Sequence, residues 1–350
     1  MKDITVIGID IAKNVIQLYG TDHEGRELLK KRLKRERFLA FMANISPCLV
    51  GMEACGGSNY WAKELIKLGH DVKLMGAQKV NKFAECNKND DKDAQACSIA
   101  VTRKNMRFVA IKSQVQQDIQ SLHRLRSFYL KQHIAQMNML RGLLLEYGIA
   151  IPQGISALKR HLNELLENTP ADLSNMMLEL VRKTYGEIVA VETKVAELTQ
   201  QVEDLANTDE QCQLLLTIAG IGPITATAFV AKVGNGCEFK RGREVSPYLG
   251  LTPRQHSSGN RQQLLGITKH GDRYLRQLLI HGGRSVVKSV MRVNKLDGAY
   301  VKQDTHSEWV RNLVDRVGVN RASVAVANRN ARIAITILKT GKRYDPNYAS

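Results

Sequence analysis

Two apolar runs in the N-terminal third of the chain each end in an acidic residue. The first, Ile4–Ile9, is rich in β-branched side chains and is followed by Asp10, and the second, Cys48–Met52, is followed by Glu53. Short apolar runs of this kind predict strands that are buried in a sheet. We therefore expect Asp10 and Glu53 at the carboxyl ends of two buried strands.

The neighbouring segments complete an α/β pattern. Further strands are predicted at 14–19, 27–29 and 71–75, and helices at 35–43, 58–67 and from about 90 to 103. The resulting order is β-β-β-α-β-α-β-α. This order resembles an RNase H-like domain, in which acids on strands and on a helix meet at one edge of the sheet.

A cluster of carboxylates lies in the last of these helices, within the segment 88–94. Asp90 and Asp93 are three residues apart and share a helix face, while Asp91 projects elsewhere. Two like charges on one face destabilise a helix unless a cation lies between them, which indicates a metal ion. A solvated helix N-terminus would favour the same residues. Together with the two strand acids, the cluster favours a site with two divalent ions for phosphoryl transfer.

Three short blocks carry these acids: GIDIAK at 8–13, MEACG at 52–56 and KNDDKDA at 88–94. They resemble the DEDD-type insertion-sequence transposases, which include the Piv invertase and have a catalytic domain similar to that of the RuvC resolvase. The resemblance covers essentially the whole chain. It implies that the catalytic, metal-binding acids are Asp10, Glu53, Asp90 and Asp93. It also implies Mg²⁺ as the cofactor, with two ions possible and Mn²⁺ as a substitute.

The middle of the chain has a helical pattern. Apolar residues recur at three- and four-residue steps through 113–147. A later stretch steps by 3, 4, 3, 4 and 3 through Ile188, Val191, Val195, Leu198, Val202 and Leu205. This seam is typical of a coiled coil, although helices packed within one chain would show it too. The resemblance adds a coiled-coil linker and a homo-oligomer, either a dimer or a tetramer.

Positive charge is concentrated in the last third. The whole chain has a net charge of +17, and residues 239–343 contain 14 Arg and 7 Lys against 6 acidic residues, a net charge of +15. Such an excess indicates a polyanionic partner. Nucleic acid is favoured over a membrane surface, because neither a basic amphipathic helix with large apolar anchors nor a lipidation motif is evident. Without a signal-peptide pattern or a long apolar run, we expect a cytoplasmic protein with no membrane partner.

Two further features of the last third suggest phosphate contacts. Gly220 and Gly222 form a turn between apolar helical segments, the pattern of a helix-hairpin-helix whose backbone N–H groups face a phosphate. A simple packing corner between two helices is the alternative interpretation. Near the C-terminus, Arg329 and Arg332 form one basic edge of a predicted helix.

A serine pair lies in a basic, glycine-flanked loop. Ser257 and Ser258 precede Gly259, and on residues alone Ser-Ser-Gly is an ordinary turn. A serine here could also attack a phosphodiester while nearby cations neutralise the developing charge. The candidate cations are Arg254, Arg261, Lys269, Arg273 and Arg276. The block resembles the second domain of the same transposases, whose nucleophilic serine precedes a glycine; this implies Ser258, with Ser257 as the fallback.

The sequence thus predicts three domains. These are a RuvC-like DEDD catalytic domain at 1–112, a helical coiled-coil linker at 113–208 and a mostly α-helical basic transposase domain at 209–345. The resemblance implies a transposase or site-specific recombinase that acts on donor and target DNA through a serine–DNA intermediate, and its relatives are guided by a noncoding bridge RNA.

Two main alternatives remain, with a non-catalytic binding protein as a weaker third. One is a RuvC-type junction-resolving endonuclease that uses only the metal site. The other is a sugar-kinase or actin-like ATPase, in which Gly8–Asp10 would open a phosphate-binding domain. It is disfavoured, because the basic, helical second half offers no second strand-Asp-Gly phosphate loop.

Overall fold

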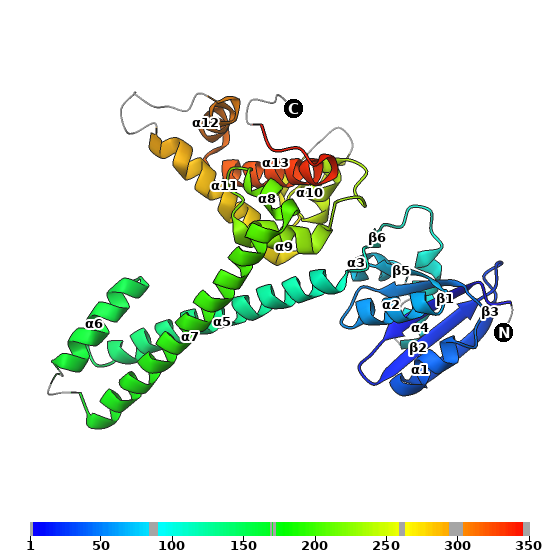
Figure 1. Cartoon of the computed structure of the whole chain (residues 1–350), viewed down its shortest axis with the longest axis horizontal. Coiled ribbons are helices and arrows are strands. Elements are labelled where there is room, and N and C mark those ends of the chain that lie inside the picture. The colour runs from blue at the N-terminus through cyan, green and yellow to red at the C-terminus, as the bar shows by residue number, and fades with distance from the viewer. Residues whose placement is uncertain are drawn as a thin grey trace. The chain divides into compact units, whose positions relative to one another are not determined.

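The computed structural model describes residues 3–83, 90–168, 170, 173–258, 263–293 and 304–345, and the side chains of residues 90, 91 and 293 lie outside this description. The chain forms two compact units, Met1–Ser113 and Gln114–Ser350 (Figure 1). Among the described residues, no helix is long and apolar enough to cross a membrane.

The first unit is built on a six-stranded mixed sheet with the order β3-β2-β1-β4-β5-β6. The strands are β1 Val6–Ile11, β2 Val15–Thr21, β3 Glu27–Lys34, β4 Leu49–Glu53, β5 Asp71–Met75 and β6 Phe108–Val109. Strands β1, β4 and β5 run parallel, while β2, β3 and β6 pair antiparallel with their neighbours. The sheet therefore joins an antiparallel meander to a parallel centre.

Helices cover both faces of β1 and β4. These helices are α1 Arg35–Met42, α2 Ser58–Lys67, α3 Ala77–Val80 and α4 Asp90–Val101. On one face, Ile7 and Val50 share a core with Phe38 of α1 and Trp61 of α2. On the other face, strand residues belong to a second core that includes Cys97 of α4. Burial on both faces explains why these strands are almost wholly apolar up to their terminal acids.

The predicted order of strands and helices is present, with α3 and β6 as additions. Strand β3 is longer than the predicted 27–29, because its second half is a basic run, Lys30–Lys34, that hides the strand pattern. This strand lies at the edge of the sheet. Lysines on an edge strand discourage pairing with other chains.

Two long helices begin the second unit, α5 Gln114–Leu145 and α7 Asn175–Thr208, with α6 Ile155–Glu167 between them in sequence. α5 and α7 pack side by side (Figure 1). Ile188, Val191 and Val202 of the predicted seam are buried on α7. α7 thus packs against a helix of the same chain, and Leu140 and Leu162 join α5 and α6 in a core at one end.

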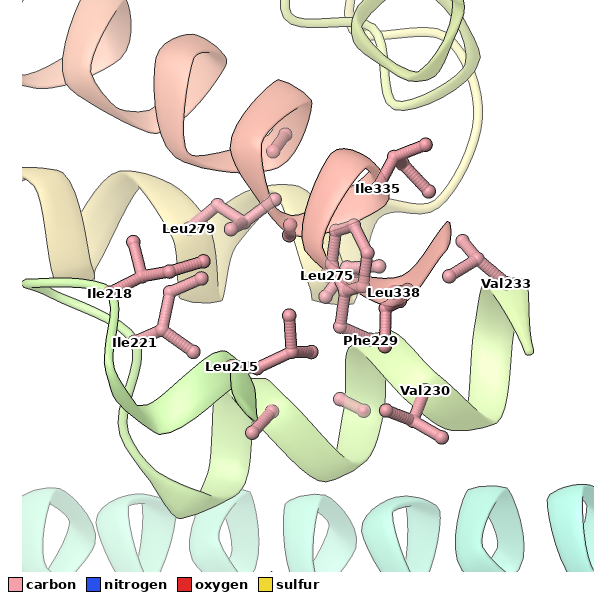
Figure 2. Packing of buried hydrophobic residues seen from close by; sticks show 14 of the residues in the cluster. Leu215, Ile218, Ile221, Phe229, Val230, Val233, Leu275, Leu279, Ile335 and Leu338 are labelled. Atoms are coloured by element: carbon pink, nitrogen blue, oxygen red, sulfur yellow. The ribbon is translucent and has the colours of Figure 1, made fainter. Parts of the chain in front are cut away.

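The remainder of this unit is mostly helical. It comprises α8 Glu210–Leu216, α9 Pro223–Val233, η1 Gly242–Glu244, α10 Val245–Tyr248, strands β7 Pro253–Gln255 and β8 Leu264–Ile267, α11 Arg273–Val293, α12 Thr305–Val317 and α13 Val319–Thr340. Its core surrounds the fully buried Phe229 of α9, where Leu215, Leu275 and Ile335 bring in α8, α11 and α13 (Figure 2). This core holds in place the β7–β8 hairpin and the basic helices.

Candidate functional site

A pair of glycines seats helix α4 directly on the sheet of the first unit. Gly8 of β1 lies opposite Gly51 of the parallel strand β4. A Cβ added at Gly8 would lie 2.0 Å from the carbonyl oxygen of Ala94, and one at Gly51 would lie 2.8 Å from that of Cys97. Neither position has room for a side chain, so the helix backbone rests on both strands.

The two strand acids leave the sheet on the side that α4 covers. Asp10 and Glu53 each lie two positions after the glycine of their strand. Side chains alternate along a strand, so each acid shares the face of its glycine. The residues between, Ile9 and Met52, are paired in register and buried in the opposite core. Asp10 and Glu53 therefore lie beside each other at the carboxyl edge of β1 and β4.

The N-terminal turn of α4 extends toward the same edge. Ala94 contacts β1 at its glycine and Cys97 contacts β4 at its glycine. Position 90 lies one helical turn before Ala94, and position 93 lies one turn before Cys97. Along the helix, position 93 is thus aligned with the residue that contacts β4, and position 90 with the residue that contacts β1.

The charges of three of the acids act on the thiol of Cys97. Burial raises its pKa, and the negative charges of Asp10, Glu53 and Asp93 raise it further. The pKa of the half-buried Cys55 is also raised, by burial and then by the charges of Glu53 and Asp10. Such interactions weaken with distance, so the three carboxylates lie on the same side of the sheet as this sulfur. The structure therefore places Asp10 and Glu53 side by side, with Asp93 near enough for its charge to act on the same thiol.

These acids suit a hard divalent cation. Carboxylate oxygens are the ligands that Mg²⁺ and Mn²⁺ prefer, and like charges at a partly buried edge repel unless a cation lies between them. Among the described side chains, no group of three or more His, Cys, Asp or Glu residues is already arranged to hold an ion. The side chain of Asp90, the fourth predicted ligand, lies outside that description.

The serine pair lies toward the tip of the β7–β8 hairpin in the second unit. The hairpin pairs Gln255 with Leu264, and both serines are exposed. The Gln255 side-chain amide donates a hydrogen bond of 3.0 Å to the Ser257 hydroxyl. Among the described residues, the Ser258 hydroxyl has no hydrogen-bond partner. Gly259 and Arg261 lie outside the described residues.

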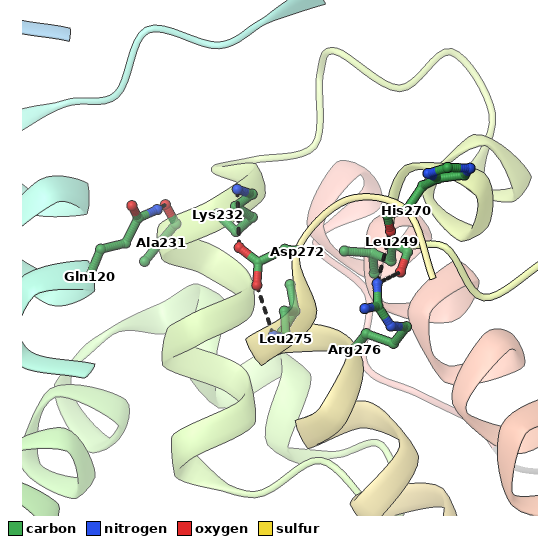
Figure 3. Close-up of polar contacts among 8 residues, drawn as sticks. All are labelled: Gln120, Ala231, Lys232, Leu249, His270, Asp272, Leu275 and Arg276. Carbon is green, nitrogen blue, oxygen red and sulfur yellow. Dashed lines mark hydrogen bonds and ion pairs between the residues drawn. The ribbon is translucent and has the colours of Figure 1, made fainter. Parts of the chain in front are cut away.

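Arg276 fastens the base of this hairpin (Figure 3). Its Nη1 donates hydrogen bonds to the carbonyl oxygens of Leu249, at 3.0 Å, and His270, at 2.8 Å. The Arg276 side chain is only 7% exposed. It therefore joins the loops before and after the hairpin, which corrects the prediction that it contacts phosphate at the surface.

An ion pair stabilises the same region (Figure 3). Asp272 accepts a hydrogen bond of 3.0 Å from the backbone N–H of Leu275 and lies 3.1 Å from Nζ of Lys232. Burial raises the pKa of Asp272, but the Leu275 hydrogen bond and the Lys232 charge outweigh it and hold that pKa below its usual value. Asp272 thus ties the start of α11 to α9.

The other predicted cations lie at different ends of the hairpin. Arg254 is exposed on β7, the strand that leads to Ser258. Lys269 and Arg273 are exposed beyond the end of β8, and Lys269 adopts a left-handed φ of 58°. At about 3.3 Å per residue, the hairpin separates Lys269 from Ser258 by roughly 15 Å or more. Of the predicted cations that the structure describes, Arg254 is the one on the strand that leads to Ser258, four residues before it.

The glycine turn has a structural role at its first glycine. Gly220 has a φ of +87°, and a Cβ there would lie 2.7 Å from the carbonyl oxygen of Gly282 on α11. The turn is also held by Asn330, whose side-chain amide donates to Ala219 at 2.8 Å. Gly220 therefore serves helix packing, a role that the turn pattern did not predict. Gly222, before the first turn of α9, is exposed with open space around it.

Both predicted arginines of the C-terminal helix lie on α13. Arg332 is exposed, and the guanidinium of Arg329 lies 4.6 Å from the ring centre of Trp309. Arg321, which we did not predict, lines the same groove as both. Its spacing of eight and eleven residues from them, typical of one helix face, could have revealed it.

Two family models match the chain. The DEDD transposase model of the IS110 group, described as "Transposase", matches residues 7–149, and a model described as "Transposase IS116/IS110/IS902 family" matches residues 212–299. The first match contains the sheet edge with its acids, and the second contains the serine hairpin. The protein is thus a transposase, a class of enzyme that acts on DNA. The DEDD domain implies an RNase H-like fold, and such domains usually use divalent metal ions.

Two relatives matched over nearly their whole length agree with this class, and a third is matched over part of its length. A probable family 20 transposase of Pseudomonas aeruginosa is 40% identical over 98% of this chain and 99% of its own. The transposase for insertion sequence element IS1111A of Coxiella burnetii is 38% identical over 98% of this chain and 92% of its own. A pilin gene-inverting protein of Moraxella bovis is 32% identical over 24% of this chain and 28% of its own. The chain belongs to the IS110/IS116/IS902 family of insertion-sequence transposases.

Proposed function

We propose that this transposase cleaves and rejoins DNA strands through a covalent intermediate on Ser258, assisted by a metal site of Asp10, Glu53, Asp90 and Asp93. The observation that carries the proposal is the register of β1 and β4, which puts Asp10 and Glu53 side by side at the edge toward which the N-terminal turn of α4 extends. Repelling carboxylates are arranged in this way where a cation is to be bound.

The metal half of the proposal concerns Mg²⁺, with one or two ions and with Mn²⁺ as a substitute. Bound divalent ions stabilise the negative charge on the attacking and leaving oxygens of phosphoryl transfer. Gly8 and Gly51 determine how closely α4 lies against β1 and β4, the strands that carry these two acids. Asp93 belongs to α4, the helix that packs on this face of the sheet. This chain therefore supplies ligands from two rigid elements whose separation the glycines determine.

The serine half concerns the exposed hairpin. In the proposed step, the Ser258 oxygen forms a bond to the scissile phosphorus while the bond from phosphorus to one sugar oxygen breaks. The serine loses its proton and the released sugar oxygen gains one, and the reverse reaction with another sugar hydroxyl rejoins the strands. Gln255 engages the hydroxyl of Ser257, which leaves Ser258 as the better nucleophile. Arg254 would neutralise the developing negative charge.

The acids and the serine belong to different units of the chain. We propose that they meet across domains or subunits, with 1–112 as the RuvC-like domain, 113–208 as the linker and 209–345 as the C-terminal transposase domain. An exposed apolar stripe on α5 supports a dimer or tetramer. Leu125, Phe128 and Met139 are exposed on it, and they fit one heptad repeat of 3- and 4-residue steps.

We further propose that donor and target DNA are recognised with the help of a noncoding bridge RNA. The net charge of +15 over 239–343 supports polyanion binding. Sequencing of RNA that copurifies with the protein tests this part. Enrichment of a noncoding RNA from the DNA that flanks the gene is expected, and a preparation that is active but free of such RNA would refute guidance.

Strand cleavage by single-serine variants tests the catalytic proposal. We expect Ser258→Ala to abolish both cleavage and the covalent protein–DNA adduct, and Ser257→Ala to retain them. A junction-resolving nuclease that uses only the metal site would instead keep cleaving after Ser258→Ala. Unchanged cleavage by Ser258→Ala would therefore reject the serine mechanism and support that alternative.

A further inference from the structure

One face of α13 lines two neighbouring cavities in the second unit. The first, of about 1120 Å³, lies between α13 and the β7–β8 hairpin. The second, of about 610 Å³, lies between α13 and η1. Arg329 and Arg332 line both cavities. We call these two cavities together the α13 trough.

The trough follows the helix over almost its full length. Its lining positions on α13 recur every three or four residues, from Arg321 in the first cavity to Thr340 in the second. Nineteen residues of α-helix span roughly 28 Å. The trough is thus long enough to follow several nucleotides of one strand, with the Ser258 hairpin as a wall at one end.

Positive charge dominates the trough. Its described lining includes seven basic residues, Arg241, Arg243, Arg321, Arg329, Arg332, Lys342 and Arg343, and one acidic residue, Asp345. Guanidinium groups pair well with phosphate oxygens. A polyanion therefore matches the charge of the trough along its length.

The end nearest the hairpin adds exposed apolar surface. Leu264 is 68% exposed on β8, and Leu265 beside it is also exposed. Both line the first cavity, together with Trp309 of α12 and Val324 of α13. Apolar and aromatic side chains beside a basic groove suit the faces of unpaired bases. In a duplex these faces are stacked, so the combination favours a single strand.

Both walls of the trough are tied to α13. Asn328 accepts a hydrogen bond of 3.0 Å from the Ser246 hydroxyl and donates one of 3.2 Å to the carbonyl oxygen of Leu251, just before the hairpin. Lys339 donates to the carbonyl oxygens of Phe239 and Lys240, at 2.8 and 3.2 Å, just before η1. The trough is therefore a preformed feature of the fold.

Arg329 occupies the junction of the two cavities. Its guanidinium lies 4.6 Å from the ring centre of Trp309. Its Nε is buried, and among the described residues it has no hydrogen-bond partner. A buried N–H group without a partner is costly, and a bound acceptor would remove that cost.

We propose that the α13 trough binds an unpaired stretch of the DNA strand that carries the scissile phosphate. The phosphates contact Arg321 and Arg332, and the bases next to the hairpin contact Leu264 and Leu265. This inference rests on the proposed function, because the hairpin wall carries Ser258. It goes beyond that function by requiring that the strand is unpaired where it passes the serine.

Binding of short oligonucleotides tests the proposal without any cleavage. Fluorescence anisotropy is measured with single-stranded DNA, single-stranded RNA and duplex DNA, in protein that carries Ser258→Ala. Arg321→Gln combined with Arg332→Gln is expected to weaken single-stranded DNA binding roughly 25-fold at 0.1 M salt and to lower the slope of log affinity against log salt by about 1.4. Arg182→Gln combined with Lys183→Gln, two exposed positions on α7, is the charge-matched control and should leave both values close to those of the unsubstituted protein.

A second variant tests the apolar end. Leu264→Asn combined with Leu265→Asn should reduce the preference for single-stranded over duplex DNA by roughly tenfold and leave the salt slope unchanged. Circular dichroism would confirm that each variant is folded. Unchanged affinity for single-stranded DNA and an unchanged salt slope in the double arginine variant would refute the proposal that the trough binds nucleic acid. A loss of affinity confined to RNA would refute the assignment of the trough to DNA. Neither result depends on whether Ser258 is the nucleophile, which is decided separately by cleavage.

Discussion

Gly8 of β1 and Gly51 of β4 lie side by side in register, and the backbone of α4 rests on both of them. This close approach determines how far the acids at the start of α4 lie from those at the strand ends. Two residues without side chains thus determine the distance between this helix and the sheet.

The first prediction concerns the packing of α4 on Gly8. Gly8→Ala would place a Cβ 2.0 Å from the carbonyl oxygen of Ala94 and force α4 away from β1. We expect the free energy of unfolding of the first unit to fall by about 2–3 kcal/mol and DNA cleavage to be lost. Gly56→Ala is the matched control, because nothing lies within 4 Å of a Cβ there. Chemical denaturation and a cleavage assay check both variants. Equal stability of the two would contradict the claim that α4 needs a residue without a Cβ at position 8.

The second prediction concerns Arg276. Arg276→Met removes two hydrogen bonds from buried carbonyl oxygens, those of Leu249 and His270. We expect a loss of about 2–4 kcal/mol in unfolding free energy and faster proteolysis of the serine hairpin. Arg273→Met, at an exposed position of the same helix, should change stability by less than about 0.5 kcal/mol. If limited proteolysis cuts the two variants at equal rates, Arg276 does not hold the hairpin.

The third prediction concerns the ion pair between Lys232 and Asp272. Asp272→Asn keeps an N-cap acceptor for Leu275 but removes the charge, so it should cost about 1 kcal/mol, whereas Asp272→Ala should cost about 2 kcal/mol. In the background of Lys232→Met, the cost of Asp272→Asn should shrink. A double-mutant cycle by urea denaturation measures this coupling, and additive effects would show that the pair contributes nothing.

The fourth prediction is a pH dependence from His123 of α5. This side chain is 4% exposed and lies 3.0 Å from the Thr227 hydroxyl and 3.1 Å from the Tyr274 hydroxyl. Burial, with a smaller effect of the Arg126 charge, lowers the pKa of His123 to about 4. The unfolded chain, with a pKa near 6.5, therefore takes up the proton first as the pH falls.

The contribution of neutral His123 is fully present above pH 6.5 and is lost as the pH falls toward 4. Between pH 8 and pH 5 the loss amounts to about 2 kcal/mol. The difference in unfolding free energy between the unsubstituted protein and His123→Gln should shrink by this amount. Fluorescence of Trp309, in a Trp61→Phe background, follows the unfolding of the second unit. A difference that is the same at both pH values would contradict the lowered pKa of His123.

The sequence predicted those parts of the site that depend on local patterns. Apolar runs with terminal acids identified the strands of Asp10 and Glu53, and helical spacing placed Asp93 on the following helix. Periodicity works here because strands buried on both faces and a helix packed on glycines leave little freedom in residue choice. Hence the α/β character of the first unit follows from the order of its apolar runs.

The structural roles that the sequence did not reveal depend on contacts formed only on folding. Arg276 looked like a surface cation because its partners, Leu249 and His270, are 27 and 6 residues away. The packing of Gly220 against Gly282 of α11 could not be predicted from the turn pattern. The α13 trough could not be predicted either, because its walls come from the hairpin and η1, which meet α13 only after folding.

The central claim is that the DEDD acids and Ser258 act in one reaction. It is tested most directly by trapping the protein on DNA, digesting the complex and locating the attached nucleotide by mass spectrometry, with and without Mg²⁺ and in Glu53→Gln. We predict an adduct on Ser258 that requires Mg²⁺ and is absent from Glu53→Gln. Efficient strand cleavage without any adduct, or an adduct on a residue other than Ser258, would contradict the account.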